Sequence, residues 1–449
     1  MNRKPIQFRL HSNAKNESNS GRYLIFAHPT KQRPILNTII VNIHCLYGIT
    51  HSNRAKKGSE MKEVGQLRNA FIEFDTNGIV DFGSMQQIGE RDLNTYSVLD
   101  AKGRLVIPSF VDCHTHAVFA ASRALEFVDR INGLSYQEVA KKGGGILNSA
   151  EKLENMTEDE LFVSAKSQLE LIIAGGTGAL EIKSGYGLNT EAELKMLRVI
   201  KRLQECYDLP IRSTFLGAHA YPKQFKEDKS KYIDLIINDM LPKIAAENLA
   251  DYIDVFCEDG YFGLPETEAI LKAGAKFGLK ARIHVNQFNS IGGVELAQKC
   301  GAISVEHLEV MTEDDISHLK NGNMFPVGLP ACSFFLEIPY TPVRRLIEEG
   351  LPVVLATDFN PGSSPCISMN FVMSLGCVKM KLLPTEAFNA VTINAANALE
   401  LQDEVGSIAH GKRANLLITN PMQDLAELPY FFGSDNISTV ILNGKVVRS

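Results

Sequence analysis

Eight short apolar segments, rich in β-branched residues, recur along the middle of the chain and alternate with segments of helical periodicity. They span 105–116, 177–185, 211–219, 252–259, 279–287, 302–309, 323–330 and 352–358. Eight strand–helix units in series predict a (β/α)8 barrel, a TIM-like fold of the α/β class. The competing architecture, a doubly wound open sheet, would place a glycine-rich turn after the first strand. The first segment here ends in histidines instead, so the barrel is favoured.

The two ends of the chain have a different pattern, typical of antiparallel β structure. Apolar, β-branched segments cover 35–50, 70–83, 414–419 and 437–447. The second and the fourth of them each contain an Asn-Gly pair, which signals a hairpin turn. Because the ends of a chain often lie close together, we expect residues 35–103 and 405–449 to form one composite β-sandwich domain. The barrel would then cover residues 104–404.

The first 34 residues are rich in Arg, Lys, Asn and Ser, with Glu17 as their only acidic residue. Such a composition is compatible with a transit peptide, because these peptides are basic and poor in acids. A disordered extension is the alternative that we favour, since no amphipathic helix is visible in the segment.

Composition and charge narrow the class of protein. A net charge of -6 argues against a nucleic-acid-binding surface. No apolar run reaches the roughly 18 residues that a membrane span requires. The eight cysteines include no C-x-x-C pair, so neither a disulfide framework nor a cysteine-rich zinc site is indicated. We therefore expect a cytoplasmic protein that binds neither nucleic acid nor membrane.

Histidines and one aspartate gather at the ends of the predicted strands. Strands 1, 3, 5, 6 and 8 end in His114 and His116, His219, His284, His307 and Asp358, respectively. The carboxyl ends of barrel strands surround one mouth, where barrel enzymes carry their active sites. A single histidine at a strand end is most simply a structural residue, but five at one mouth indicate a metal site. Imidazole and carboxylate donors suit both zinc and iron.

The motifs PSFVDCHTH, RIHVNQ, VEHLE and LATD together resemble the amidohydrolase superfamily of metal-dependent hydrolases. EIKSGYGL, TFLGAHAYP and TDFNPGSSP are similar to the branch of that superfamily that opens the lactam ring of 4-imidazolone-5-propanoate in histidine degradation. The resemblance extends from about residue 35 to residue 449. It implies hydrolysis to N-formimidoyl-L-glutamate by a metal-bound hydroxide, with one zinc or iron ion per chain, in a homodimer.

The resemblance also implies the metal ligands, which are His114, His116, His284 and Asp358. Asp358 would in addition accept the proton of the attacking water. His307 would be a second catalytic residue that orients the water or the carbonyl group; the alternative is a buried structural histidine. Two-metal members of the superfamily carry a carboxylated lysine on strand 4. The predicted fourth strand has no lysine, so one metal is expected, and Lys183 on strand 2 is interpreted as structural.

Substrate contacts follow from the resemblance as well. Arg123 matches the residue that binds the propanoate carboxylate, although without the resemblance it would be interpreted as a surface arginine. The other implied contacts are Tyr186, His219, Asn360, Gly362 and Ser363. We expect the Asn-Pro-Gly turn to present backbone N–H groups for an anion beside the metal.

Gln287 departs from the pattern of some members of the branch, which carry an acid–base glutamate three residues after the strand-5 histidine. An amide does not exchange a proton, so proton transfer would depend on Asp358 and His307. Two other functions stay open: a related amidohydrolase or deaminase acting on another cyclic amide or amidine, and a catalytically silent paralogue that acts through assembly. The sequence does not distinguish zinc from iron.

Overall fold

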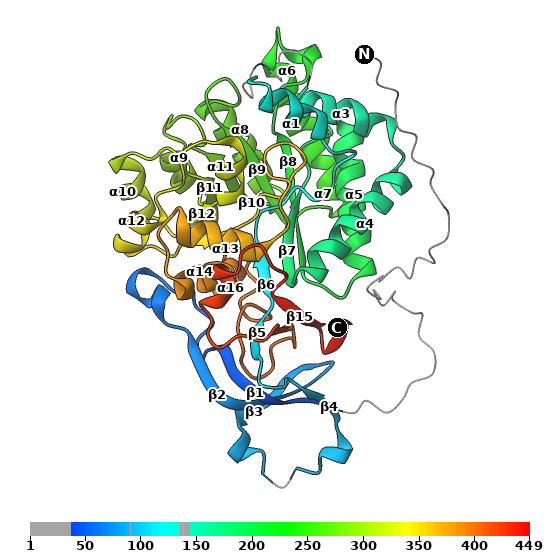
Figure 1. The fold of residues 1–449 in the computed structure, drawn as a ribbon. Coiled ribbons are helices and arrows are strands. Elements are labelled where there is room, and N and C mark those ends of the chain that lie inside the picture. Colours follow the sequence, from blue (N-terminus) through cyan, green and yellow to red (C-terminus); the bar gives the residue numbers. More distant parts are fainter. Residues whose placement is uncertain (1–36, 90, 135–137, 139–143) are drawn as a thin grey trace, which may run out of the picture.

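The computed structural model describes residues 37–89, 91–134, 138 and 144–449. The basic segment 1–34 lies outside the described residues. Two sheets of eight strands each organise the rest of the chain. One forms the wall of a barrel surrounded by helices, and the other lies beneath one end of that barrel (Figure 1).

The barrel strands are parallel and follow one another around the wall in chain order. They are β6 (Phe110–Asp112), β7 (Thr177–Lys183), β8 (Ile211–Ala218), β9 (Tyr252–Cys257), β10 (Lys280–Val285), β11 (Ser304–His307), β12 (Phe325–Gly328) and β13 (Val354–Leu355). Each lies within one of the eight predicted segments, which confirms the barrel.

Contacts just beyond β13 close the ring against the segment that follows β6. The backbone amide of Asp358 donates to the carbonyl oxygen of His114 at 3.1 Å, and the amide of His116 donates to Phe359 at 2.8 Å. The Thr357 hydroxyl donates to the buried carboxylate of Asp112 at 2.6 Å. The ends of the first and the last strand therefore meet at the barrel mouth.

Helices connect the strands and cover the outside of the barrel (Figure 1). They are α1 (Ala124–Ile131), α3 (Ile146–Asn155), α4 (Glu158–Ala174), α5 (Thr190–Cys206), α6 (Lys229–Leu235), α7 (Leu241–Glu247), α8 (Leu264–Ala275), α9 (Gly293–Lys299), α10 (Glu313–Asn321), α11 (Pro330–Leu336), α12 (Val343–Glu348), α13 (Met369–Val378), α14 (Pro384–Ala390), α15 (Ile393–Ala398) and α16 (Glu427–Tyr430). A π-helical turn, Ile236–Met240, joins α6 to α7.

Local sequence explains where several helices begin. At the start of α4, Thr157 accepts from the amide of Glu160 at 3.2 Å, and the Glu160 carboxylate accepts from the amide of Thr157 at 2.9 Å. This reciprocal capping satisfies amides that have no partner within the helix. Asn189 caps α5 in the simpler way, by accepting from the amide of Ala192 at 2.9 Å.

The second sheet combines both ends of the chain, as expected. Its strands are β1 (Thr38–Ile49), β2 (Gly65–Asp75), β3 (Gly78–Ser84), β4 (Ser97–Asp100), β5 (Leu105–Pro108), β14 (Leu416–Thr419), β15 (Ile437–Leu442) and β16 (Lys445–Arg448). The order is β16-β15-β14-β5-β1-β2-β3, with β4 also paired to β1. The expected sandwich is thus one continuous sheet, and residues of β1, β2, β3, β5, β14 and β15 share an apolar cluster.

The first predicted strand, 105–116, is divided between the two sheets. Its first part, β5, pairs with β1 and β14. The amide of Ser109 still donates to Asn415 of the lower sheet at 2.9 Å, whereas the amide of Phe110 donates to Gly176 beside β7 at 3.0 Å. An apolar run does not reveal which sheet it joins. We propose that the domain division follows the two sheets and passes through Ser109, a few residues beyond the expected boundary at 103–104.

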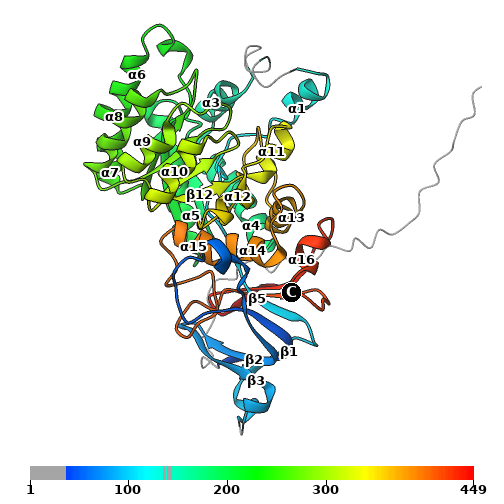
Figure 2. The ribbon, with the colours of Figure 1, turned by 90° about the vertical axis from the view of Figure 1, so that its left-hand side faces the viewer.

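The lower sheet packs against the amino ends of the barrel strands. Leu417 of β14 lies close to Gly176, and the Asn415 amide donates to the carbonyl oxygen of Gly178 at 2.9 Å. Figure 2 shows the sheet at one end of the molecule and α1 and α3 at the other. The carboxyl ends of the strands therefore open away from the sheet. Among the described residues, no helix is both long and apolar enough to cross a membrane.

Candidate active site

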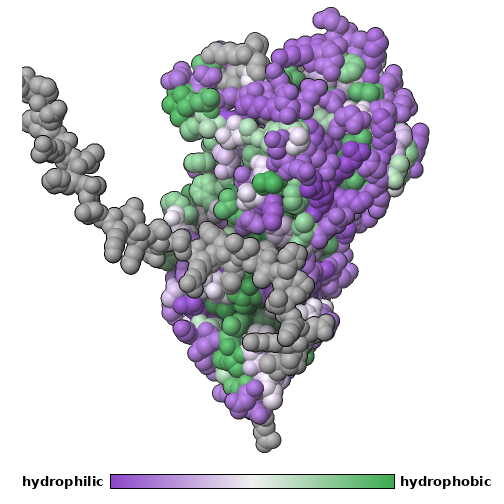
Figure 3. Space-filling view, turned by 90° about the vertical axis from the view of Figure 1, so that its right-hand side faces the viewer, coloured by the Kyte–Doolittle hydropathy of each residue, from purple (hydrophilic) through white to green (hydrophobic). Residues whose placement is uncertain are grey.

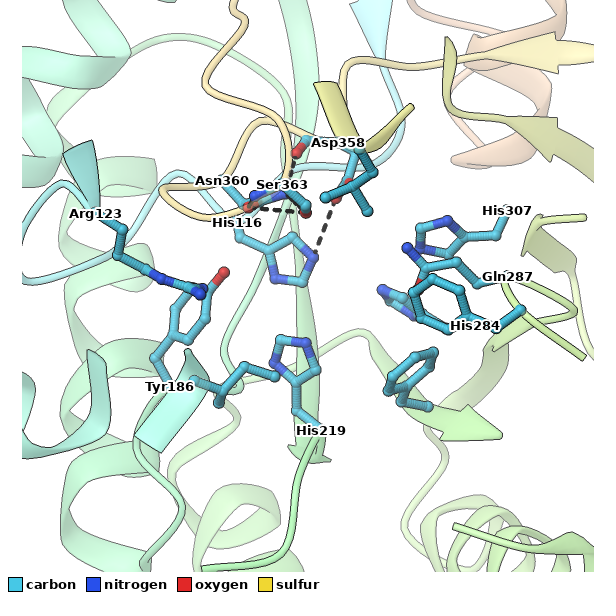
Figure 4. Close-up of a pocket in the computed structure, with 14 residues that line it drawn as sticks. His116, Arg123, Tyr186, His219, His284, Gln287, His307, Asp358, Asn360 and Ser363 are labelled. Carbon is cyan, nitrogen blue, oxygen red and sulfur yellow. Dashed lines mark hydrogen bonds and ion pairs between the residues drawn. The ribbon is translucent and has the colours of Figure 1, made fainter. Parts of the chain in front are cut away.

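A pocket opens at the carboxyl ends of the barrel strands. Ten of its lining residues are labelled in Figure 4: His116, Arg123, Tyr186, His219, His284, Gln287, His307, Asp358, Asn360 and Ser363. All ten are among the residues that the sequence singled out. Two further residues that the sequence singled out do not line the pocket. His114 is fully buried behind the lining, and Gly362 lies beneath Arg123.

Three histidines and one aspartate converge at the floor of this pocket. Nitrogen atoms of His114, His116 and His284 lie within 4.8 Å of one another. Asp358 Oδ1 is 3.3 Å from His114 Nε2 and 3.5 Å from His116 Nε2. Donor atoms held about 2.1 Å from a tetrahedral metal lie about 3.4 Å apart. The spacing therefore fits a single metal ion.

The imidazoles have nitrogen atoms available for a metal. His284 Nε2 has no hydrogen-bond partner among the described residues. Burial lowers the pKa of His284 to about 4 and holds the pKa of His116 well below its usual value, so both rings are neutral. Burial opposes charge on His114, but the carboxylates of Glu306 and Asp358 together outweigh burial and raise the pKa of His114 to about 9. A metal bound at His114 would displace that proton.

His307 ends β11 with its ring facing the same pocket (Figure 4). Its Nδ1 atom lies 3.3 Å from Glu309 Oε1, an oxygen that also accepts from the Ser333 hydroxyl at 3.2 Å. Because an ionised carboxylate only accepts, Nδ1 carries the proton and Nε2 is the nitrogen left for the pocket. His307 and Asp358 have φ of +84° and +52°, and strained backbone of this kind clusters at functional sites.

The Asn-Pro-Gly turn differs from the expected anion site. The amides of Gly362 and Ser363 donate to Asn360 Oδ1 at 2.8 and 2.7 Å. The expectation that these N–H groups bind an anion is wrong for this arrangement, because the Asn360 side chain already occupies them. What the turn offers the pocket is the side chains of Asn360 and Ser363.

Arg123 is a buried pocket residue and not a surface arginine. It precedes α1 and is 7% exposed, and its guanidinium is 2.7 Å from Glu126. A Cβ atom at position 362 would lie 2.0 Å from Arg123 Nη1. Gly362 therefore makes room for the guanidinium, and its side-chain position does not itself contact the pocket.

The hydrogen bonding of His219 restricts what it can bind. Its Nδ1 atom lies 3.0 Å from the carbonyl oxygen of Gly185, which can only accept. Burial lowers the pKa of His219 to about 3, so the ring is neutral and Nε2 is an acceptor. The ring stacks on His116 with the centroids 5.3 Å apart. In this tautomer His219 can accept from a substrate N–H group but cannot donate to a carbonyl oxygen.

Gln287 reaches the pocket from the loop after β10. Its amide nitrogen is 3.6 Å from the buried thiol of Cys332, and the residue is 7% exposed. The side chain thus brings to the pocket an amide, a group that does not titrate.

The sequence did not reveal a layer of charged residues buried beneath the histidine cluster. Its members are Glu181, Lys183, Asp254, Arg282 and Glu306, all on barrel strands and at most 1% exposed. One signal was present in the sequence. Arg282 precedes His284 by two positions and therefore shares its face of β10, inside the barrel.

Comparison with known proteins identifies the class of the chain. Residues 105–447 match the Amidohydrolase family. The fold also resembles solved structures at low sequence identity: guanine deaminase of E. coli (TM-score 0.70, 13% identity, 91% of this chain and 98% of that chain) and an adenosine deaminase from Xanthomonas campestris (TM-score 0.67, 14% identity, 91% and 92%). The chain belongs to the amidohydrolase family.

Much higher identity relates the chain to one group within that family. It is 53% identical over 411 residues to the imidazolonepropionase of Flavobacterium johnsoniae, covering 91% of this chain and 100% of the relative. The imidazolonepropionase of Christiangramia forsetii is 51% identical over 413 residues, with 92% and 100% covered. Within the amidohydrolases, the chain belongs with the imidazolonepropionases.

Proposed function

We propose that the chain hydrolyses the cyclic amide of 4-imidazolone-5-propanoate to N-formimidoyl-L-glutamate in histidine degradation. The observation that carries this proposal is the pairing, in one pocket, of a metal-binding cluster with the buried cation of Arg123. Arg123 and Tyr186 lie on one side of the pocket and His284 and His307 on the other (Figure 4). A substrate with a lactam carbonyl at one end and a carboxylate at the other matches this arrangement.

His114, His116, His284 and Asp358 would hold one metal ion per chain, either zinc or iron, since both accept imidazole and carboxylate donors. When bound, the metal activates a water molecule and polarises the lactam carbonyl group.

Asp358 would accept the proton of the attacking water. Burial alone raises the pKa of this carboxyl group, but the surrounding histidines outweigh burial and hold the pKa below its usual value. Asp358 is therefore ionised when substrate binds. Hydrolysis adds hydroxyl to the carbonyl carbon and a proton to the leaving ring nitrogen as the C–N bond breaks. His307, oriented by Glu309, would direct its free nitrogen at the reacting groups.

Substrate recognition would divide among the remaining pocket residues. Arg123 would pair with the propanoate carboxylate, because a charge in a closed pocket requires a partner. His219 would accept an N–H group of the ring, and Tyr186, Asn360 and Ser363 would offer further polar contacts. Gln287 cannot carry a proton, so acid–base chemistry rests on Asp358 and His307.

We propose a homodimer as the assembly. Exposed apolar side chains follow one edge of the molecule, on α1, α11, α13 and α16; they include Leu125, Val128, Ile131, Phe334, Val378 and Tyr430. Figure 2 shows these four helices along the same edge, and Figure 3 shows hydrophobic residues gathered along one edge of the face it presents. A contiguous apolar surface of this kind typifies protein interfaces. Light scattering of the purified protein would give the mass of a dimer if this is correct and of a monomer if it is not.

A cytoplasmic location is proposed as well. All eight cysteines are free, which suits a reducing compartment. A protein sent through an oxidising compartment would be expected to pair some of them. Cell fractionation would test the location.

The function is tested by a steady-state assay with freshly generated 4-imidazolone-5-propanoate, following the loss of its ultraviolet absorbance. Metal content is measured on the same sample. Turnover of the substrate by metal-loaded protein is the expected result. A sample with about one metal per chain and no turnover would overturn the assignment and direct attention to other cyclic amides.

A further inference from the structure

The ammonium group of Lys183 lies beneath the metal-binding cluster, and the Lys183 side chain is fully buried. It contacts three carboxylates: Glu181 Oε1 at 2.8 Å, Asp254 Oδ2 at 2.9 Å and Glu306 Oε2 at 3.1 Å. The three carboxylates come from β7, β9 and β11 and are also buried. Lys183 is not among the residues that line the pocket, so it does not reach the substrate.

Each of these carboxylates contacts a different part of the histidine cluster. Asp254 Oδ2 lies 2.9 Å from His284 Nδ1, and Asp254 Oδ1 accepts from the backbone amide of His284 at 3.2 Å. Glu306 Oε2 contacts His114 Nδ1. The third carboxylate, Glu181, accepts at 3.3 Å from the amide of Thr115, the residue between His114 and His116. His284 and His114 are therefore each connected to Lys183 through a carboxylate, and the backbone between His114 and His116 is connected to it through Glu181.

Two of the contacts select the form of the ring that a metal needs. A carboxylate beside Nδ1 keeps the proton there, which leaves Nε2 free to bind the metal. His284 Nε2 has no hydrogen-bond partner among the described residues, and His114 Nε2 is the atom that lies 3.3 Å from Asp358 Oδ1. Asp254 Oδ2 and Glu306 Oε2 lie close to Lys183 Nζ and to the histidine rings, but the angles are not those of well-directed hydrogen bonds. Charge attraction, more than a directed bond, holds them in place.

Electrostatics explain why a cation is needed at this point. Oxygen atoms of Asp254 and Glu306 lie within 4.8 Å of each other in a buried site, where two carboxylates repel strongly. Arg282 neutralises the other side of Glu306, with its Nε atom 2.8 Å from Oε1. Lys183 occupies the space between the facing oxygens. Without its charge, one carboxylate would have to take up a proton or turn away, and the histidine that it holds would turn with it.

We propose that Lys183 is a positioning residue for the metal centre: its ammonium group fixes Glu181, Asp254 and Glu306. Asp254 and Glu306 in turn orient the rings of His284 and His114, and Glu181 holds the backbone between His114 and His116. The inference rests on the proposed metal site, but not on the identity of the substrate. Three carboxylate contacts and full burial identify Lys183 as an ammonium group, which distinguishes it from the carboxylated lysine ligand of two-metal relatives.

The test measures metal affinity in the absence of substrate, for the full chain with Zn²⁺ and with Co²⁺ as a spectroscopic probe. In Lys183→Met the side chain keeps its length and loses its charge. Affinity for both ions is expected to fall about 10- to 100-fold, with a changed visible spectrum of the Co²⁺ form. Lys412→Met is the matched control, because Lys412 is a buried lysine in the segment before β14 that contacts Gln402 and Ser407. Its metal affinity should equal that of the wild type.

A second pair of variants keeps the proposal testable if Lys183→Met alone does not fold. Asp254→Asn should lose affinity to a similar extent, and Lys183→Met with Asp254→Asn removes one charge of each sign. If Lys183 acts through the carboxylates, the double variant loses less affinity than the product of the two single losses. The proposal would be overturned if folded Lys183→Met bound metal with wild-type affinity. It would also be overturned if the loss of affinity in the double variant equalled the product of the two single losses. A wild-type protein that binds metal but leaves the imidazolone intact would refute the proposed substrate and not this inference.

Discussion

Asp358 contacts His114 twice, once through the backbone and once through the side chain. Its amide donates to the carbonyl oxygen of His114 at 3.1 Å, and its Oδ1 atom lies 3.3 Å from His114 Nε2. The first contact joins the end of the first barrel strand to the end of the last, and the second brings together two proposed metal ligands. Closure of the barrel and assembly of the metal site therefore depend on the same residues.

Metal removal should consequently lower the stability of the fold. A ligand that binds only the folded state at about 100 times its Kd stabilises it by about 2.7 kcal/mol. We expect a chelator to lower the thermal midpoint and added Zn²⁺ to restore it, as measured by calorimetry. In Asp358→Asn the midpoint should respond much less to either treatment. An equal response in both proteins would contradict a role for Asp358 as a ligand.

Arg123→Gln should weaken substrate capture. Loss of a hydrogen-bonded charge pair costs about 1.5–3 kcal/mol, which is about 10- to 150-fold in kcat/KM. The fold should tolerate the change, because Glu126 also accepts from the amide of Gly145 at 3.0 Å and from Asn148 at 2.9 Å. Steady-state kinetics on the imidazolone provide the measurement.

Arg130→Gln is the control for that experiment. Arg130 lies in α1, the helix that Arg123 precedes; its guanidinium lies over the ring of Phe335, and it does not line the pocket. Its kinetics should match those of the wild type. If both variants lose activity equally, the effect comes from the helix and not from recognition of a carboxylate.

The barrel, and the gathering of histidines and Asp358 at its mouth, could be predicted from the sequence for a physical reason. Buried parallel strands appear as short apolar runs, and residues at their carboxyl ends meet at one mouth, so His284 and Asp358 could be placed together although 74 positions separate them. The division of 105–116 between two sheets could not be predicted. It depends on the partners of Ser109 and Phe110, which lie far away in the chain.

Other parts of the site depend on side-chain rotamers and on pairings between distant residues, which a single sequence does not reveal. The pattern NPGSS predicts a turn, but whether its amides face a ligand or the Asn360 side chain is decided by a rotamer. Charged residues inside strands usually indicate a solvent-exposed face. Lys183 and Glu306 are buried because each is the partner of the other, and that pairing across strands appears only in the folded barrel.

Glu309→Gln should reduce turnover through His307. The amide that replaces the carboxylate no longer holds the Nδ1 proton strongly, so the ring of His307 loses its orientation. We expect kcat to fall by about 10- to 100-fold with metal content unchanged. Ser333→Ala, which removes only the hydroxyl donor to the same oxygen, should have a much smaller effect. Equal losses of turnover in the two variants would show that Ser333 matters as much as Glu309. The pair of His307 and Glu309 would then have no separate role.

Lys412 should make stability depend on pH. It is buried in the segment before β14, against Gln402 and Ser407, and burial lowers its pKa from 10.5 to about 8. Below pH 8 Lys412 is protonated in both the folded and the unfolded state, so it does not make the free energy of unfolding depend on pH. Between pH 8 and 10.5 only the unfolded state carries it, so the free energy of unfolding should rise with pH, by up to about 1.4 kcal/mol per unit. Urea titrations at pH 7, 8.5 and 10, compared with Lys412→Met, isolate this contribution. A difference between the two proteins that stays constant across the series would mean that Lys412 titrates normally in the fold.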